Sequence, residues 1–289
     1  MEYYKHYEKW HKDTVESKLA DINEYKNFVK LHNVLPNKNA KILELGCCMG
    51  RLMITLKELE ITNIKGVDIE PEFIKIAKNE GLDVIQSDIL DFLRNSDEKF
   101  DAIYCFDVIE HIDKELQEEL FIELNRHLNN EGFVAIKTIN ALSPTASYFR
   151  YIDLTHKLSY TPDTLEFLSK LGGFNEVVIR PEYQEVEEDK VLKALFAQLY
   201  NVQFGMKDVI LTPNLIAILF KSKEIAEQYK INAPKINNNY SAYHYENHHI
   251  KSLVQYYISK MVYKLTFGKI DLYNLSHTKY KFVVFKIQK

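Results

Sequence analysis

The chain is predicted to turn from a buried strand into a helix at ELGCCMG, residues 44–50. Glycine has no side chain, so Gly46 and Gly50 let a ligand approach the backbone closely and tolerate positive φ angles. The N–H groups exposed where a helix begins bind polar ligand groups. The stretch therefore predicts a nucleotide-binding turn, although two glycines alone also fit an ordinary strand-to-helix turn.

Two acids stand at the ends of the next two predicted strands. Asp68 ends the second strand, and Asp88 follows the third. In open α/β sheets ligands bind at the carboxyl ends of strands, where a carboxylate accepts hydrogen bonds from ribose hydroxyls. Asp68 fits that role, and Asp88 could accept a bond from an adenine amino group while Ile89 flanks the ring. Either acid alone is also a common surface turn residue, but all three elements at successive strand ends predict a nucleotide site.

Short apolar runs alternate with helical patterns along most of the chain, which is typical of a parallel α/β sheet. Several runs are rich in Ile and Val, as expected of strands buried on both faces. The predicted strands are 41–45, 64–68, 83–86, 100–106, 133–138, 176–180 and 215–220. The predicted helices are 16–35, ended by Pro36, and 50–60, 71–79, 114–128, 162–171 and 189–203. We therefore expect an α/β fold with a doubly wound, mostly parallel seven-stranded sheet.

Four segments resemble the successive motifs of class I S-adenosylmethionine-dependent methyltransferases: 43–52, 66–70, 87–90 and 101–112. The resemblance implies a Rossmann-like methyltransferase fold, with S-adenosyl-L-methionine as cofactor and S-adenosyl-L-homocysteine as product. The cofactor-binding residues that it implies are Glu44, Gly46, Cys48, Gly50, Asp68, Ile69, Asp88, Ile89 and Phe106. Cys48 departs from the family pattern, which usually has glycine at that position.

Two missing motifs narrow the class of enzyme. The turn lacks the Gly-x-Gly-x-x-Gly spacing of dehydrogenases. The fourth strand ends in Phe106-Asp107-Val108, without the Asn/Asp-Pro-Pro-aromatic motif of enzymes that methylate amino groups of nucleic-acid bases. We therefore expect no nucleic acid as partner.

The three cysteines, two of them adjacent, fit neither a disulfide framework nor a zinc site. We therefore predict no metal site, although Asp153 and His156 could contribute to one. The sequence has no apolar run long enough to span a membrane and no signal-peptide core at its start, so we expect a cytoplasmic location without stable membrane insertion.

A long loop with aromatic, basic and acidic residues follows the fifth strand, and such loops are often functional. A hydroxyl acceptor gains from a base, because a neutral alcohol is a poor nucleophile. His156 is the predicted base, since imidazole titrates near neutral pH, and Asp153 orients it or binds the substrate. His111, in a Glu-His pair that resembles the family motif, is the rival. The alternative is structural: Asp153 and His156 hold the loop together, and His111 caps a helix or packs on the cofactor turn.

Arg150 is a candidate for holding an acceptor phosphate through its planar guanidinium, or else forms a surface salt bridge. Tyr148 and Tyr160 are further candidate substrate contacts. Three segments, 153–156, 159–162 and 172–174, resemble methyltransferases of bacterial capsule and O-antigen polysaccharide synthesis. This resemblance implies O-methylation of a carbohydrate or nucleotide-linked precursor of surface polysaccharide. The alternatives are a phosphate or phosphoramidate oxygen, a small metabolite, and a non-catalytic regulator or scaffold.

The predicted methyltransferase domain covers residues 1–222, with an N-terminal lid or packed helix face carrying Trp10. A C-terminal appendage, 223–289, comprises a linker, an amphipathic helix at 250–265 and a strand at 280–287. Residues 221–289 hold 12 lysines and 4 acids, a net charge of +8, which leaves −12 for residues 1–220 of a chain with net charge −4. This basic extension indicates an anionic partner or acceptor, a solvated surface, a homodimer contact, or a helix lying on a membrane.

Overall fold

The structure is a computed structural model that describes residues 14–183, 187–206 and 208–236. The chain divides into two compact units, residues 1–185 with 209–238, and residues 186–208 with 239–289. The first unit holds the sheet. The described part of the second unit is the helix α8 (Glu187–Phe204) with the residues directly after it. The lid around Trp10 and the predicted elements at 250–265 and 280–287 lie outside the described residues, and the boundary after residue 222 stays a prediction.

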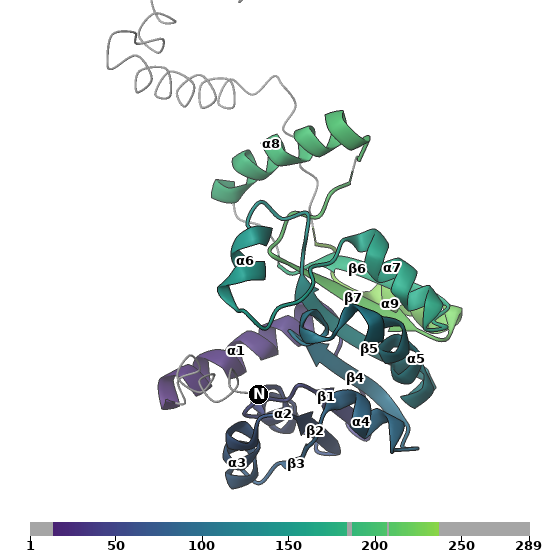
Figure 1. The fold of residues 1–289 in the computed structure, drawn as a ribbon. Coiled ribbons are helices and arrows are strands. Elements are labelled where there is room, and N and C mark those ends of the chain that lie inside the picture. Colours follow the sequence, from purple (N-terminus) through teal and green to yellow (C-terminus); the bar gives the residue numbers. More distant parts are fainter. Residues whose placement is uncertain (1–13, 184–186, 207, 237–289) are drawn as a thin grey trace, which may run out of the picture. The chain divides into compact units, whose positions relative to one another are not determined.

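A mixed seven-stranded sheet forms the centre of the first unit (Figure 1), in the order β3-β2-β1-β4-β5-β7-β6. Neighbouring strands from β3 to β5 are parallel, whereas β7 runs antiparallel to both β5 and β6. The strands are β1 (Ile42–Leu45), β2 (Ile64–Asp68), β3 (Asp83–Gln86), β4 (Phe100–Phe106), β5 (Leu128–Ile139), β6 (Glu176–Pro181) and β7 (Asn214–Phe220). The predicted doubly wound sheet is confirmed. Only β5 differs by more than one residue at an end, since it begins at Leu128 rather than at residue 133.

Helices cover both faces of the sheet, and each face has its own apolar core. One core contains side chains of α1 (Val15–Leu31), α2 (Arg51–Glu58), α3 (Pro71–Asn79) and α9 (Lys223–Asn232). The other contains side chains of α4 (Ile89–Arg94), α5 (Gln117–His127) and α7 (Pro162–Leu171). The remaining helices of this unit are α6 (Ala146–Ile152) and two 3₁₀ turns, η2 (Ile109–His111) and η3 (Lys114–Leu116). No described helix is long and apolar enough to cross a membrane.

The first helix ends earlier than predicted. Pro36 was expected to end it, but α1 stops at Leu31, and Asn33 adopts a left-handed φ of 51°. Asparagine tolerates this conformation better than most residues, and it commonly ends a helix. The N–H of Val34 then donates to the Val29 carbonyl, which satisfies one of the last helical acceptors.

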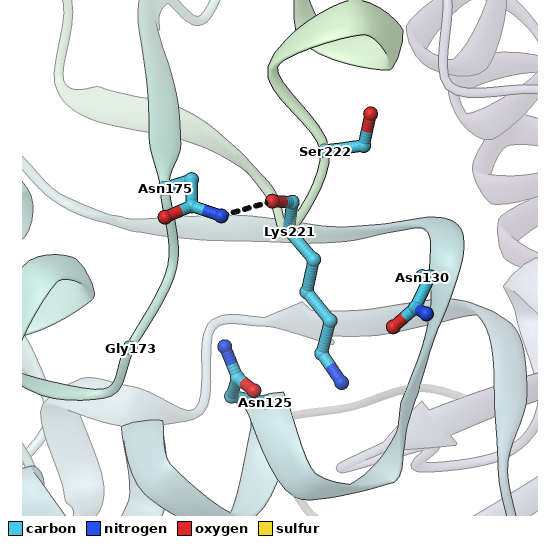
Figure 2. A pocket seen from close by; sticks show the side chains of 6 residues that line it. All are labelled: Asn125, Asn130, Gly173, Asn175, Lys221 and Ser222. Carbon is cyan, nitrogen blue, oxygen red and sulfur yellow. Dashed lines mark hydrogen bonds between the residues drawn. The ribbon is translucent and has the colours of Figure 1, made fainter.

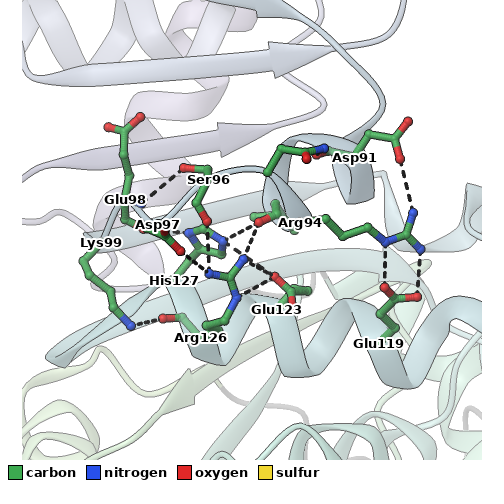
Figure 3. A network of polar contacts seen from close by, with 12 residues as sticks. Asp91, Arg94, Ser96, Asp97, Glu98, Lys99, Glu119, Glu123, Arg126 and His127 are labelled. Atoms are coloured by element: carbon green, nitrogen blue, oxygen red, sulfur yellow. Dashed lines mark hydrogen bonds and ion pairs between the residues drawn. The ribbon is translucent and has the colours of Figure 1, made fainter.

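A polar network ties the end of α5 to the segment that leads into β4 (Figure 3). The buried His127 ring places Nδ1 2.6 Å from the Glu98 carbonyl oxygen and Nε2 2.9 Å from that of Leu93. Beside it, Arg126 donates to the Ser96 carbonyl and pairs with Glu123. The network fixes where β4 begins, and β4 carries the candidate site at its other end.

We expect His127→Leu to lower the free energy of unfolding by about 2 kcal/mol, because it removes the ring contact of two inward-facing carbonyl groups. Urea denaturation measures the change. The matched control is Arg94→Ala, which breaks an exposed pair with Glu119 in the same network and should leave the urea midpoint almost unchanged. Equal midpoints for His127→Leu and the wild type would contradict this role.

Candidate active site

The turn after β1 has the geometry that its glycines predict. Gly46 and Gly50 have φ angles of 70° and 75°, in the left-handed region. A Cβ atom on Gly46 would lie 2.2 Å from Cγ2 of Val108, the residue that follows Asp107 after β4. A side chain at position 46 would therefore collide with the neighbouring strand end, so the glycine lets the turn after β1 lie directly against the segment after β4.

Asp68 connects this turn to the next strand. Its Oδ2 accepts a hydrogen bond of 2.8 Å from the Cys48 N–H, and its Oδ1 accepts one of 2.9 Å from the Glu70 N–H. Burial raises the pKa of Asp68 above its ordinary value, although these backbone donors oppose the shift. The carboxylate thus holds the turn and the start of α3 in place, and each of its oxygens has a second lone pair for a ligand.

Glu44 lies beneath the turn, buried within β1. Its Oε2 atom is buried and has no hydrogen-bond partner. Burial and the nearby charge of Asp68 raise the Glu44 pKa well above its ordinary value. A buried carboxyl oxygen without a donor is costly, and a cationic or donor group of a ligand would relieve that cost.

The predicted adenine end of the site lies at the carboxyl end of β3. Asp88 is the N-cap of α4, and its Oδ1 accepts the N–H groups of Leu90 and Asp91 at 2.8 and 3.1 Å. Ile69 is 40% exposed and Ile89 half-buried, so both present apolar surface to a ring. This capping role is compatible with a ligand contact through Oδ2, and the adenine role stays a prediction.

Phe106 ends β4 but lies among core side chains. Its ring packs 4.9 Å from that of Phe28 and 6.3 Å from that of Tyr25, both on α1. The next residue, Asp107, has a left-handed φ of 55° and pairs with Lys137 at 2.9 Å. A strained residue of this kind costs about 1–3 kcal/mol and is typical of functional sites.

A second cluster brings together the three predicted catalytic residues. His111 ends the turn η2 just after β4, and Asp153 and His156 lie in the loop after α6. The His111 and His156 rings are 4.7 Å apart, and His156 Nε2 lies 4.0 Å from Asp153 Oδ2. Sequence reasoning treated the two histidines as rivals, whereas the fold places them in one cluster.

Thr155 joins this cluster, and sequence reasoning missed it. Its hydroxyl donates to Asp153 Oδ1 at 2.7 Å and lies 2.8 Å from His111 Nδ1. The Asp-x-Thr spacing was the available signal, because Asp side chains often accept a hydrogen bond from the residue two positions later. Burial, with a smaller contribution from His156, lowers the pKa of His111 to about 4, so His111 is uncharged near neutral pH.

The structure does not bring the three predicted substrate contacts together at this cluster. Tyr148 is 62% exposed on α6, and Arg150 donates to the Lys157 carbonyl at 2.7 Å. Tyr160 is buried, and its hydroxyl donates to the Ile109 carbonyl at 2.8 Å. Tyr160 therefore supports the turn that carries His111, and substrate binding by all three residues stays a prediction.

An open polar hollow lies at the other end of β5, away from both clusters (Figure 2). It is lined by Asn125, Asn130, Gly173, Asn175, Lys221 and Ser222. The Asn175 amide donates to the Lys221 carbonyl across it. The hollow contains none of the predicted site residues.

Comparisons with known proteins show similarity to methyltransferases. Residues 42–132 match the family model described as a methyltransferase domain. The chain is 26% identical over 153 residues to the mitochondrial ubiquinone biosynthesis O-methyltransferase of Candida albicans, covering 50% of this chain and 46% of that protein. It is 34% identical over 84 residues to the corresponding Xylella fastidiosa enzyme, covering 27% of this chain and 34% of that one. The chain thus spans less than half of the length of these relatives.

Solved structures show the same fold. A SAM-dependent methyltransferase from Archaeoglobus fulgidus aligns with a TM-score of 0.57 at 24% identity, over 75% of this chain and 99% of that one. A Haemonchus contortus phosphoethanolamine N-methyltransferase, solved with S-adenosylhomocysteine, aligns with a TM-score of 0.51 at 16% identity, over 69% of this chain and 53% of that one. The chain therefore has the fold of these methyltransferases, and residues 42–132 of it match a methyltransferase domain.

The residues around the turn fit S-adenosylmethionine. The cofactor carries an amino group and a ribose, and the buried Oε2 of Glu44 lacks a donor while Asp68 stands at the end of β2. Because Gly46 and Gly50 present bare backbone, the cofactor can approach the turn between these acids. When bound, it supplies an electrophilic methyl group, and the residues of this chain bind and orient it.

Cys48 departs from the family pattern at a strained position, with a φ of 48°. The left-handed conformation costs a residue with a side chain about 1–2 kcal/mol, whereas glycine adopts it freely but loses about 0.5–1 kcal/mol of chain entropy on folding. The difference between these two costs is a net stabilisation of about 0.5–1 kcal/mol. We therefore expect Cys48→Gly to raise the melting temperature by about 2 °C. Differential scanning calorimetry measures it.

Cys48→Val is the matched comparison, because a β-branched residue is disfavoured at positive φ. It should lower the melting temperature. S-Adenosylhomocysteine affinity should stay the same or increase in Cys48→Gly, because the 48 N–H still reaches Asp68. A lower melting temperature for Cys48→Gly would show that the backbone at this position is not strained.

Proposed function

We propose that this chain transfers the methyl group of S-adenosylmethionine to a hydroxyl oxygen of a small-molecule acceptor. One observation carries the proposal: the cofactor turn follows β1, and His111 of the His-Asp cluster (His111, Asp153 and His156) follows the neighbouring strand β4. Gly46 packs against Val108, three residues before His111. A donor held by the turn and an acceptor held by the cluster would therefore lie next to each other.

The backbone also fixes the catalytic loop to the strand end. The Glu110 carbonyl accepts the N–H groups of Lys157 and Leu158, at 2.7 and 3.2 Å. The loop residues Asp153 and His156 are thereby held against the turn that carries His111. Methyl transfer depends strongly on such positioning, because holding the reactants in line removes much of the entropic barrier.

Two acceptor classes follow from different observations. The loop segments 153–156 and 159–162 resemble polysaccharide methyltransferases, which favours a sugar hydroxyl on a nucleotide-linked precursor. The curated relatives are O-methyltransferases of ubiquinone biosynthesis, which favours a hydroxyl on a quinone precursor. Because these named relatives support the second class, it should be tested first. A phosphate oxygen needs no base, and no contact at the His-Asp cluster favours it.

The test begins with calorimetry of S-adenosylmethionine and S-adenosylhomocysteine, for which we expect micromolar binding. Radioactive methyl transfer is then measured to catechol-type ring hydroxyls and to nucleotide-sugars. Transfer to either class supports an O-methyltransferase and selects the acceptor. Cofactor binding without transfer to any acceptor would favour the non-catalytic scaffold, and no cofactor binding would overturn the proposal.

The remaining expectations belong to the same proposal: a small-molecule or glycan-precursor acceptor, no nucleic acid, no stable membrane insertion and a cytoplasmic location. The C-terminal extension stays the predicted surface of a homodimer.

A further inference from the structure

Three side chains with metal-binding atoms converge at the His-Asp cluster. One ligand atom from each of His111, Asp153 and His156 lies within 4.8 Å of the other two. The side chains of Asp153 and His156 are 15% and 14% exposed, so the cluster is shielded but reachable from solvent. Two ligands bonded to one ion at about 2.1 Å are at most about 4.2 Å apart, so small side-chain rotations would complete the site.

The hydrogen bonds around the cluster select one tautomer for each ring. His156 Nδ1 lies 2.8 Å from the Phe149 carbonyl oxygen, which can only accept, so Nδ1 carries the proton. The single hydroxyl proton of Thr155 goes to Asp153 Oδ1, so His111 Nδ1 must donate to Thr155 Oγ1. In both neutral rings Nε2 is then left as the lone-pair atom.

This pattern is the one that supports metal-bound histidines. A ligating imidazole usually donates its other N–H to a carbonyl, carboxylate or other acceptor, which fixes its orientation and increases its basicity. Here Phe149 provides the carbonyl for His156, and the Thr155–Asp153 pair provides the acceptor chain for His111. The Thr155 N–H also donates to Asp153 Oδ1 at 2.7 Å, which orients the carboxylate.

Without a cation at the cluster, the His156 and Asp153 atoms that face each other repel. His156 Nε2 faces Asp153 Oδ2 across 4.0 Å, and in the tautomer set by Phe149 both atoms are acceptors. A cation between them converts this opposition into attraction. A proton on His156 would also do so, which is the acid–base alternative that the experiment must separate from a metal.

We propose that His111, Asp153 and His156 bind a divalent first-row transition metal ion. Two imidazoles and one carboxylate on one side of an ion leave other coordination positions open. The mixed nitrogen and oxygen set suits Mn²⁺, Fe²⁺, Co²⁺ or Zn²⁺ better than Mg²⁺ or Ca²⁺, which prefer oxygen ligands. The sequence predicted no metal site, although Asp153 and His156 were named as possible contributors, and the proposal adds His111 from a distant segment.

The role of the ion rests on the proposed function, whereas its binding does not. An acceptor hydroxyl on an open position would have a lowered pKa and would release its proton to solvent. The oxygen then forms a bond to the methyl carbon as the carbon–sulfur bond breaks, and S-adenosylhomocysteine leaves as a neutral thioether. The products are the methyl ether, S-adenosylhomocysteine and one proton.

The test uses Co²⁺ as a spectroscopic probe on the full chain after removal of metals with EDTA. We expect one equivalent to bind with visible d–d absorption bands, and Mg²⁺ not to displace it. Asp153→Asn and His156→Ala should each weaken Co²⁺ binding at least tenfold. His248→Ala/His249→Ala is the matched control, because adjacent histidines elsewhere in the sequence could bind the ion adventitiously, and this variant should bind Co²⁺ normally.

S-Adenosylhomocysteine binding is measured on every variant, because it reports folding and the cofactor turn independently of the metal. Normal cofactor binding in a wild type that binds no Co²⁺ would overturn the metal site and leave the proposed function intact. Equal Co²⁺ affinity in the wild type, Asp153→Asn and His156→Ala would also overturn it. Site-specific Co²⁺ binding in a protein that methylates no acceptor would support the metal site and count against the proposed function.

Discussion

Asp68→Ala should lower the affinity for S-adenosylhomocysteine at least a hundredfold. The carboxylate is expected to accept two hydrogen bonds from the ribose, and hydrogen bonds to charged groups contribute about 1.5–3 kcal/mol each. Losing both removes about 3 kcal/mol or more, which corresponds to at least two orders of magnitude in the dissociation constant. Isothermal titration calorimetry measures the change.

The same substitution also removes the acceptors of the Cys48 and Glu70 N–H groups, so part of the loss comes from the turn itself. Asp68→Asn separates the two effects, because its carbonyl oxygen keeps one of these bonds, and it should bind with intermediate affinity. Asp91→Ala removes an exposed acid from the first turn of α4 and should bind normally. Wild-type affinity in Asp68→Ala would exclude the ribose role.

The sheet could be predicted almost completely because its central strands β1, β4 and β7 are apolar and buried. The predicted strands 64–68, 83–86 and 100–106 match β2, β3 and β4 at both ends, although only Val84 of the edge strand β3 is buried. The prediction began β5 too late because residues 128–132 contain two asparagines, a glutamate and a glycine, which are poor strand formers. Pairing of Leu128 with Phe100, before a register shift to the pair of Ala102 with Phe133, outweighs that preference.

Three helices were missed for different physical reasons. None of the residues of α6 is buried, so no apolar period marks it. α4 has only six residues, too short for a period, although Asp88 caps it. α9 was assigned to the basic appendage by charge, whereas Ala226 and Tyr229, three residues apart, are buried in the core and Ser222 caps the helix.

The two parts of the candidate site also differ in how well the sequence predicts them. The cofactor turn is local, so ELGCCMG and the strand-end acids were sufficient to predict it. The catalytic cluster is not local, because His111 and Asp153 are separated by α5, β5 and α6. The approach of His111 to Asp153 depends on the bonds between Glu110 and residues 157 and 158, which no spacing in the sequence indicates. Thr155 was missed although its Asp-x-Thr spacing is local, because its second contact, with His111, joins distant segments.

His156→Ala should lower turnover by about a hundredfold to ten-thousandfold, the usual contribution of a positioned acid–base group. S-Adenosylhomocysteine binding should stay within about twofold of the wild type, because none of the described hydrogen bonds of His156 reaches the cofactor turn. Single-turnover methyl transfer measures the chemical step. Lys157→Ala is the matched control. Lys157 is the next residue along the loop, and its side chain forms an exposed ion pair with Asp113.

A lower turnover alone does not separate the two roles open to His156, but its pH dependence does. For a general base, kcat/KM of the wild type rises with pH across the range in which imidazole loses its proton, added imidazole partly rescues His156→Ala, and EDTA has no effect. For a metal ligand, EDTA abolishes the wild-type rate and Co²⁺ restores it, while imidazole rescues the variant only when the metal is present. Turnover of His156→Ala within twofold of the wild type would exclude both roles. The function of this residue would then be its hydrogen bond to the Phe149 carbonyl, which holds the loop against α6.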